Sequence, residues 1–255
     1  MEIKRRLVLS TALGLAALPL PRAGLAEPAQ SFPPPQLPLP QSIWTGPYAG
    51  IQLGWAGSAS PSVGCTFVGA SPCSPDGTPA MHVNNALTGF DAGYSWQWGW
   101  WLLGAEADLD ALGVYDTEHF PGRDNGYYSN GAKLTSGYDW LGTARARTGI
   151  VVDRTLFFAT GGFAAAGVQH SYSDLLDNTA STSGTRTGWT AGAGVEYALT
   201  EKFSLKAEYL YVGLPSSSLT VNNYNFSSMS PFGGTSTLKF HNDLNIVRAG
   251  LNFHF

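Results

Sequence analysis

Eight charged residues share one face of the strands that this sequence predicts, and they are its main candidates for chemistry. Gathered inside a barrel, carboxylates and cations could form an ion-selective constriction or a catalytic carboxylate pair. They could instead pair with one another as a closed network of buried salt bridges. Because side chains just fill the interior of an eight-stranded barrel, the closed network is favoured over a conducting pore. The eight residues are Glu106, Asp108, Arg145, Arg147, Glu196, Lys206, Glu208 and Arg248.

The sequence contains no motif of the common enzyme classes. It has no Gly-x-Ser-x-Gly, P-loop or dinucleotide fingerprint, and its histidines form no His-x-x-x-His or acid-linked motif. It therefore predicts no catalytic residue, no cofactor, no metal and no enzymatic activity. A lipid-modifying enzyme with a Ser/His pair at the barrel rim stays a further alternative. The histidines are His82, His119, His170, His241 and His254.

Cys65 and Cys73 are the only two cysteines of the chain. An exported protein meets an oxidising compartment, where two cysteines this close together form a disulfide by default. His82 and Asp76 lie nearby but lack the spacing of metal ligands. The sequence therefore predicts a disulfide that closes a small loop.

The last strand of the chain alternates clearly between apolar residues and mostly polar or small ones. A period of two indicates one apolar and one polar face, and a terminal aromatic residue is typical of the closing strand of an outer-membrane barrel. This strand would also carry the C-terminal signal for the barrel-assembly machinery. The residues of the signal are Val247, Ala249, Leu251, Phe253 and Phe255.

Eight strand-like runs begin after Trp44, and long polar loops alternate with short turns between them. This order predicts an all-β, eight-stranded antiparallel transmembrane up-and-down β-barrel, with the long loops outside and the short turns in the periplasm. In the fourth run, Tyr138 and Trp140 share the apolar face, and the fifth run is too uniformly apolar to phase. The runs are about 48–56, 85–97, 101–109, 137–151, 155–168, 189–197, 203–211 and 240–255; the long loops are about 59–83, 110–136, 169–184 and 213–239.

A soluble, lipocalin-like barrel is the structural alternative. It would carry apolar residues inside and charges outside, whereas here one face holds Trp, Tyr, Phe, Leu and Ala and the other holds Gly and paired charges. Only 13% of the residues are charged, against about 25% in soluble domains. The membrane barrel is therefore favoured.

The first 26 residues are predicted to be a cleaved secretory signal peptide, because a basic start precedes a short apolar run. Residues 27–43 are proline-rich and predict an extended periplasmic linker, and the barrel takes up residues 44–255. Cleavage removes four of the 14 Lys and Arg residues and one of the 18 Asp and Glu residues, which leaves a formal charge of −7. A chain this acidic predicts no nucleic-acid partner.

The opening Trp44-Thr45-Gly46-Pro47-Tyr48-Ala49-Gly50 resembles the WTGxYxG start of the outer-membrane immunogenic proteins, a family of small porin-like barrels in Gram-negative bacteria. The resemblance implies an OmpA-like barrel in the cell outer membrane that serves envelope integrity and surface exposure. Outer-membrane lipid and lipopolysaccharide are expected partners because basic residues near the loops, Arg123, Lys133, Arg186 and Lys239, could contact lipopolysaccharide phosphates. The loops depart from the family and could also meet a surface ligand or host factor. Further matching blocks occur at 93–97, 103–108, 140–147, 160–164, 192–197 and the C-terminus.

Overall fold

The computed structural model describes residues 42–60, 62–67, 71–72, 82, 84–119, 133–173, 179–222 and 235–255. The expected signal peptide and almost all of the expected linker lie outside these residues. One short 3-10 helix, η1 (Ser42–Trp44), precedes the first strand. No helix in the described part of the chain is long and apolar enough to cross a membrane.

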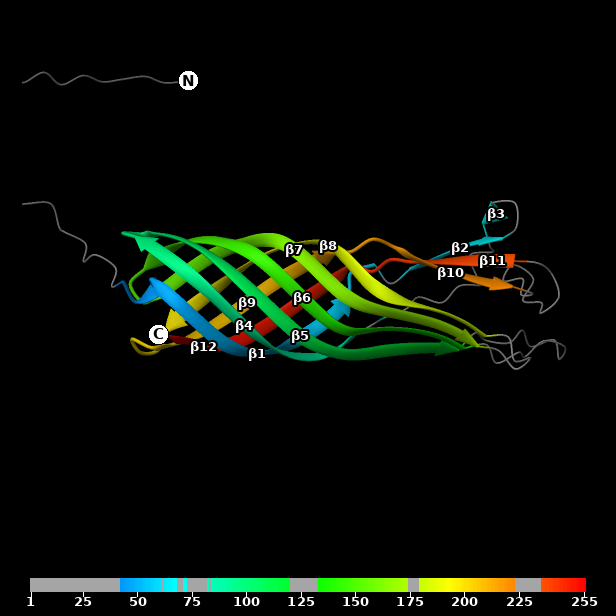
Figure 1. Cartoon of the computed structure of the whole chain (residues 1–255), viewed down its shortest axis with the longest axis horizontal. Coiled ribbons are helices and arrows are strands. Elements are labelled where there is room, and N and C mark those ends of the chain that lie inside the picture. Colours follow the sequence, from blue (N-terminus) through cyan, green and yellow to red (C-terminus); the bar gives the residue numbers. More distant parts are fainter. Residues whose placement is uncertain are drawn as a thin grey trace, which may run out of the picture. The chain divides into compact units, whose positions relative to one another are not determined.

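Eight antiparallel strands close into a barrel (Figure 1). The first strand closes the ring because Leu53 lies opposite Thr88 on one side and Ala249 of the last strand on the other. The all-β, eight-stranded up-and-down barrel is thereby confirmed. Around the ring, the strands are β1 (Gly46–Ser58), β12 (Leu244–His254), β9 (Phe203–Gly213), β8 (Thr179–Ala198), β7 (Thr155–Ser173), β6 (Lys133–Val152), β5 (Trp101–His119) and β4 (Asn84–Trp98).

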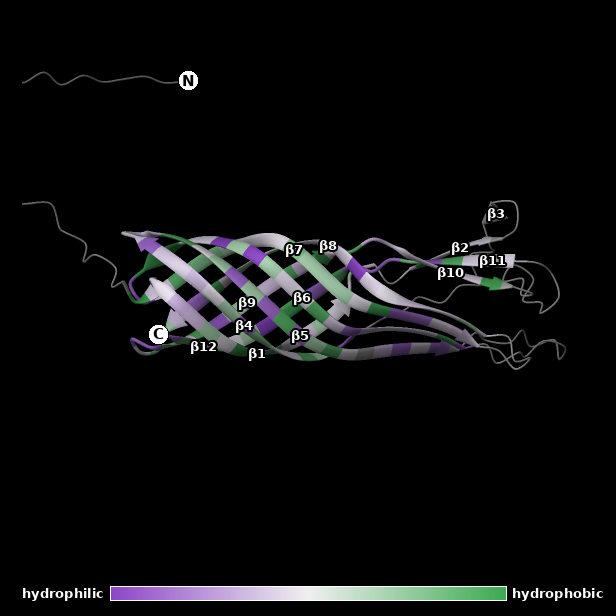
Figure 2. Cartoon of the chain, in the orientation of Figure 1, coloured by the Kyte–Doolittle hydropathy of each residue, from purple (hydrophilic) through white to green (hydrophobic). Residues whose placement is uncertain are grey.

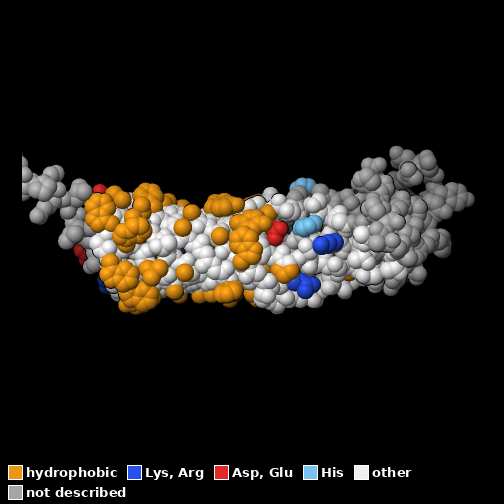
Figure 3. All heavy atoms as spheres, turned by 90° about the horizontal axis from the view of Figure 1, so that it is seen from above, with side chains coloured by type: hydrophobic (Ala, Val, Ile, Leu, Met, Phe, Trp, Pro, Cys, Tyr) orange, Lys and Arg blue, Asp and Glu red, His pale blue; other side chains and the backbone are white. Residues whose placement is uncertain are grey.

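Alternate residues of each strand face opposite sides of the barrel wall. On β1, Leu53 is 67% exposed whereas its neighbour Gln52 is 1% exposed. Figure 2 shows the alternation of hydropathy along the strands, and Figure 3 shows hydrophobic side chains gathered in two groups along the barrel surface. Exposed rings occur near the short turns, as at Trp101, and again toward the other end, as at Trp140 and Trp189. This pattern matches the lipid-facing band and two aromatic girdles of an outer-membrane barrel.

Three short turns join strands at one end of the barrel. Gly99 (φ +59°) and Asp153 (φ +52°) adopt the left-handed backbone in the β4–β5 and β6–β7 turns, a conformation that glycine and aspartate tolerate. In the β8–β9 turn, the backbone N–H of Phe203 donates to Thr200 Oγ1 at 3.0 Å. Because outer-membrane barrels keep their short turns in the periplasm, this end is the periplasmic end of the barrel.

At the extracellular end, two hairpins continue beyond the runs that the alternation predicts. β5 ends at His119 and β6 begins at Lys133, so strands cover both ends of the expected loop 110–136. β7 and β8 likewise cover most of the expected loop 169–184. These loop predictions are wrong because the hairpins beyond the membrane carry polar residues on their outer face, and no lipid-facing apolar pattern reveals them as strands.

Two register shifts involve β6. One lies between Ala111 and Val114, where β5 pairs with β6, and the other lies between Tyr138 and Leu141, where β6 pairs with β7. A bulge inserts an extra residue and changes which face the following side chains occupy. Tyr138 is therefore buried inside at 3% exposure, while Trp140 faces outward. This corrects the expectation that both residues lie on the outer face.

The first and last long loops contribute a second sheet at the extracellular end, here named the cap sheet. Its strands are, in order, β10 (Ser217–Asn222), β11 (Thr235–Phe240), β2 (Val63–Phe67) and β3 (Ser71–Pro72). Because Phe240 belongs to β11, the closing strand begins at Leu244 rather than at Phe240. The cap sheet packs on the extended hairpins through a buried cluster of Val63, Leu134, Tyr172, Leu219, Val221, Leu238 and Phe240.

Replacing Leu238 with alanine should loosen the cap sheet and leave the barrel folded. Leu238 is fully buried in the cluster, and its truncation is expected to cost about 2–3 kcal/mol. Protease added to intact cells should then cut the cap strands faster, while the barrel keeps its heat-modifiable gel mobility. Thr220→Ala, on the exposed face of the same sheet, is the control; equal cleavage of the two variants would contradict the packing.

Candidate functional site: the barrel interior

The middle of the barrel interior is charged. Among the described residues, six carboxylates and four cations lie there, and the side chains of all ten ion-paired groups are at most 2% exposed. We call this set the charged layer. It consists of Asp91, Glu106, Asp108, Asp110, Glu196, Glu208, Arg145, Arg147, Lys206 and Arg248.

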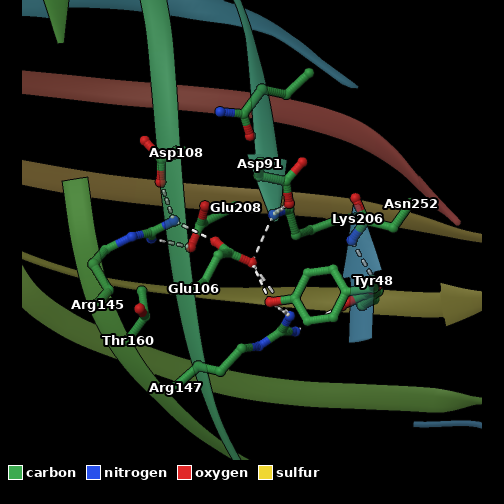
Figure 4. Close-up of polar contacts among 12 residues, drawn as sticks. Tyr48, Asp91, Glu106, Asp108, Arg145, Arg147, Thr160, Lys206, Glu208 and Asn252 are labelled. Atoms are coloured by element: carbon green, nitrogen blue, oxygen red, sulfur yellow. Dashed lines mark hydrogen bonds and ion pairs between the residues drawn. The ribbon is translucent and has the colours of Figure 1, made fainter. Parts of the chain in front are cut away.

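Glu106 lies at the centre of the charged layer and receives contacts from three other strands (Figure 4). Tyr48 of β1 donates its hydroxyl to Glu106 Oε2 at 2.7 Å, and Lys206 Nζ of β9 lies 3.0 Å from the same oxygen. Arg147 Nη1 of β6 approaches at 3.3 Å, and Arg145 pairs with the other carboxylate oxygen. One carboxylate therefore connects strands on opposite sides of the barrel.

Two arginines share the carboxylates on the extracellular side of Glu106. Arg145 Nη1 lies 2.6 Å from Glu208 Oε1, and its Nη2 lies 2.7 Å from Asp108 Oδ2. Arg248 Nε lies 2.9 Å from Glu208 Oε2, while its Nη1 lies 2.7 Å from Asp110 Oδ2. Such forked, charge-assisted hydrogen bonds are the strongest that side chains form, and they fix the geometry of both partners.

Six carboxylates meet four cations in this layer, and neutral side chains donate further hydrogen bonds to four of the carboxylates. Each of these donors is itself buried, so its hydrogen bond is protected from water. The layer is consequently a network of hydrogen bonds as well as of charges. The donors with their acceptors are Tyr48 with Glu106, Thr143 with Asp108 (2.6 Å), Gln52 with Asp110 (2.8 Å), and Asn252 (2.9 Å) and Ser204 (2.5 Å) with Glu196.

An apolar layer occupies the periplasmic end of the interior. Trp44 of η1 enters the barrel here, where it is 2% exposed and its ring meets His254 edge-on with centroids 5.6 Å apart. A helix-borne indole thus covers the charged layer from the periplasm. The periplasmic apolar layer consists of Trp44, Leu102, Val151, Leu156, Phe158 and Ala198.

A larger apolar layer covers the charged layer from the extracellular side. Its side chains come from every barrel strand except β8 and from the segment after β9, and all are buried. The charged layer is therefore enclosed between two apolar layers. This extracellular apolar layer consists of Ala56, Leu87, Leu112, Tyr138, Leu141, Ala164, Ala166, Val168, Leu210, Val212, Leu214, Leu244 and Ile246.

A Ser/His pair does occur near the periplasmic rim, as the enzyme alternative requires. Ser204 Oγ lies 2.9 Å from His254 Nε2, but Ser204 also donates to Glu196 and is only 1% exposed. In hydrolytic triads, the carboxylate holds the far nitrogen of the histidine, which leaves the near nitrogen to take the serine proton. Here Glu196 Oε1 lies on the serine side, 3.6 Å from Nε2 itself. The geometry is that of a buried hydrogen-bond cluster.

The structure brings together all eight charged residues that the sequence singles out. Two further members, Asp91 and Asp110, were not predicted from the sequence. Asp91 stands on the polar face of its run among glycine, serine and glutamine, and Asp110 falls in an expected loop. Every second residue of β5 faces inward, and Asp110 is the next inward position after Asp108, so extending the alternation would have identified it.

The other predicted sites lie elsewhere. The alternate apolar residues of β12 face outward, with Val247 62% and Phe255 76% exposed. The backbone of Cys65 pairs with Leu238 in the cap sheet, but Cys73 and the Cys65 side chain lie outside the described residues. Within the described ranges, no group of three or more His, Cys, Asp or Glu residues could hold a metal ion.

Comparisons with known proteins agree with this architecture. The family model of the outer membrane protein beta-barrel domain matches residues 12–232. The chain is 31% identical over 233 residues to the 31 kDa outer-membrane immunogenic protein of Brucella melitensis, covering 87% of this chain and 88% of that one. It is 27% identical to the 25 kDa outer-membrane immunogenic protein of Brucella abortus, covering 99% of each. The fold resembles the outer membrane protein OprG from Pseudomonas aeruginosa (TM-score 0.51, 15% identity, 85% of this chain and 100% of that one).

Proposed function

Because this chain belongs to the family of outer membrane β-barrel proteins and lies in the outer membrane, we propose that it is a closed, non-enzymatic barrel with a structural role in the envelope. The proposal includes outer-membrane lipid and lipopolysaccharide as its surroundings and the barrel-assembly machinery as the partner that inserts it. Its relatives are named for immunogenicity and location, which is consistent with a role at the cell surface.

The observation that carries the proposal is the layered interior. Each of the ten charged side chains is ion-paired with at least one other, and apolar side chains cover them on both sides. A diffusion pore needs charges that remain hydrated along a continuous path. Buried ion pairs contribute little net stability but hold each strand against its partners in one register, which suits a structural barrel.

The cap sheet supports the second part of the proposal, a surface-interaction role. It presents an ordered face with Thr66, Thr220 and Lys239 exposed, on a cluster of buried apolar side chains. A packed sheet fixes the relative positions of its exposed residues, which lowers the entropy lost when a partner binds. We infer that such a partner meets the cap sheet and the hairpin ends.

The test is single-channel recording of residues 27–255, refolded and reconstituted in a planar bilayer. We expect silence or rare flickering at voltages that open a general porin measured in the same bilayer. Trp44→Ala should stay silent too, because the charged layer and the extracellular apolar layer remain in place. Steady, reproducible conductance steps from the unaltered chain would overturn the closed barrel and favour a small diffusion porin with a charged lumen.

A further inference from the structure

A groove of about 550 Å³ lies in the outer wall of the barrel, over β4, β5 and β6. Its walls are formed by Phe90, Leu109 and Trp140, whose side chains all face outward. Thr88, Gly89 and Ala111 form its floor, where small side chains leave the space open. The groove is therefore an apolar hollow in the surface that faces lipid.

One side of the hollow is formed by Trp140, which lies where β6 changes its register with β7. Trp140 lies opposite Ala111 on β5, in the last pair before the β5–β6 register shift, and the indole lies close against Gly167 of β7, where a Cβ would come within 2.6 Å of Trp140 Nε1. A Cβ at Gly142 would stand 3.6 Å from the Trp140 ring and 3.7 Å from Leu109. A side chain at residue 142 would therefore stand between Trp140 and Leu109, in contact with both.

The groove lies in the extracellular half of the membrane band. Phe90 is eight residues along β4 from Trp98 at the periplasmic turn. At about 3.3 Å per residue and a tilt of about 40°, this amounts to about 20 Å in a band about 25 Å tall. The outer leaflet there consists of lipopolysaccharide.

We propose that this groove binds one acyl chain of lipopolysaccharide. The side chains of its walls are aliphatic and aromatic. Each methylene group of an acyl chain makes more van der Waals contacts in this concave groove than in the fluid lipid around the barrel. The polar residues beyond it, toward the headgroups, are engaged with one another: Tyr115 and Gln169 both donate to Asp139, the latter at 2.6 Å. The groove consequently recognises the acyl chain rather than a phosphate group. This binding does not depend on whether the barrel interior is closed.

The experiment measures lipid retained by the full chain purified from outer membranes of a strain with truncated lipopolysaccharide. Native mass spectrometry counts lipopolysaccharide and phospholipid on each barrel as detergent is raised. We expect one lipopolysaccharide molecule to persist after other lipids are removed. Gly142→Leu, which places a side chain between Trp140 and Leu109, should reduce its retention about tenfold.

Gly161→Leu is the matched control, because Gly161 also faces outward and a Cβ there meets only the Thr190 carbonyl oxygen, at 3.6 Å. It should retain lipid as the unaltered chain does. Ala111→Trp fills the groove from the floor and replaces Gly142→Leu if that variant fails to fold. Equal retention by the filled and control barrels, no retained lipid, or retained phospholipid in place of lipopolysaccharide would each overturn the proposal.

Discussion

Replacing Arg145 with methionine is expected to lower the free energy of unfolding of the barrel by about 3–5 kcal/mol. The side chain of Arg145 is fully buried and pairs with Glu106, Asp108 and Glu208. Methionine keeps most of the volume but leaves three carboxylates facing one another without that cation. Removing one partner of a buried ion pair costs far more than the pair contributes, because the remaining charge stays desolvated.

The measurement is urea unfolding of the refolded barrel in lipid vesicles, followed by tryptophan fluorescence and by gel mobility. Arg154→Met is the control: Arg154 is exposed in the β6–β7 turn and only approaches the Leu199 carbonyl oxygen at 3.4 Å. Its loss should change stability by less than about 0.5 kcal/mol. If Arg145→Met is equally mild, the carboxylates are hydrated, and the charged layer lines a water-filled lumen.

A second variant separates lost charge from lost packing. Combining Arg145→Met with Glu208→Gln removes one of the three carboxylates that lose their contact with Arg145, while Arg248 still contacts residue 208. The double variant should recover part of the stability that the single variant loses. Additive losses would instead mean that the two side chains act independently.

The lipid-facing pattern and the positions of eight of the ten charges of the charged layer could be predicted from the sequence. Where the interior is polar, as at Lys206 and Glu208, inward and outward residues differ in type and the period of two is visible. The apolar layers could not be predicted in this way. At Trp101-Leu102-Leu103 and Leu156-Phe157-Phe158, both faces of the strand are apolar, so the alternation disappears. The run 155–168 could not be phased for this reason, because inward-facing Leu156 and Phe158 belong to the periplasmic apolar layer.

The cap sheet and the bulges depend on contacts that no local pattern contains. Leu238 pairs with Cys65, far earlier in the chain, and the pairing follows from which loops the closed barrel brings together. Tyr138 has the same local sequence signal as an outward residue and faces inward because of the register shift after it. The alternation on the outer face is thus visible in the local sequence of each strand. The layers of the interior and the packing of the cap sheet instead depend on the closure of the barrel.

Deleting Phe255 is expected to lower the amount of folded protein in the outer membrane several-fold. The backbone N–H of Phe255 donates to the Pro47 carbonyl oxygen at 3.2 Å, across the seam between the first and last strands. Its ring meets Phe253 edge-on at 5.0 Å, and Phe253 in turn meets Phe203 of β9 at 5.2 Å. Phe255 therefore lies at the seam that closes the barrel, where the barrel-assembly machinery is expected to recognise the terminal strand.

Two alanine variants distinguish an assembly signal from a loss of apolar surface at the membrane interface. Phe255→Ala and Phe203→Ala each remove one exposed ring from the same group of aromatics. If the terminus is read by the assembly machinery, Phe255→Ala should reduce outer-membrane levels while Phe203→Ala leaves them near normal, with both chains refolding equally well in vesicles. Equal reduction would assign the effect to interfacial burial of the rings. Normal levels of the Phe255 deletion would show that the closing strand inserts without its terminal aromatic, and the seam with β1 would then be sufficient for assembly.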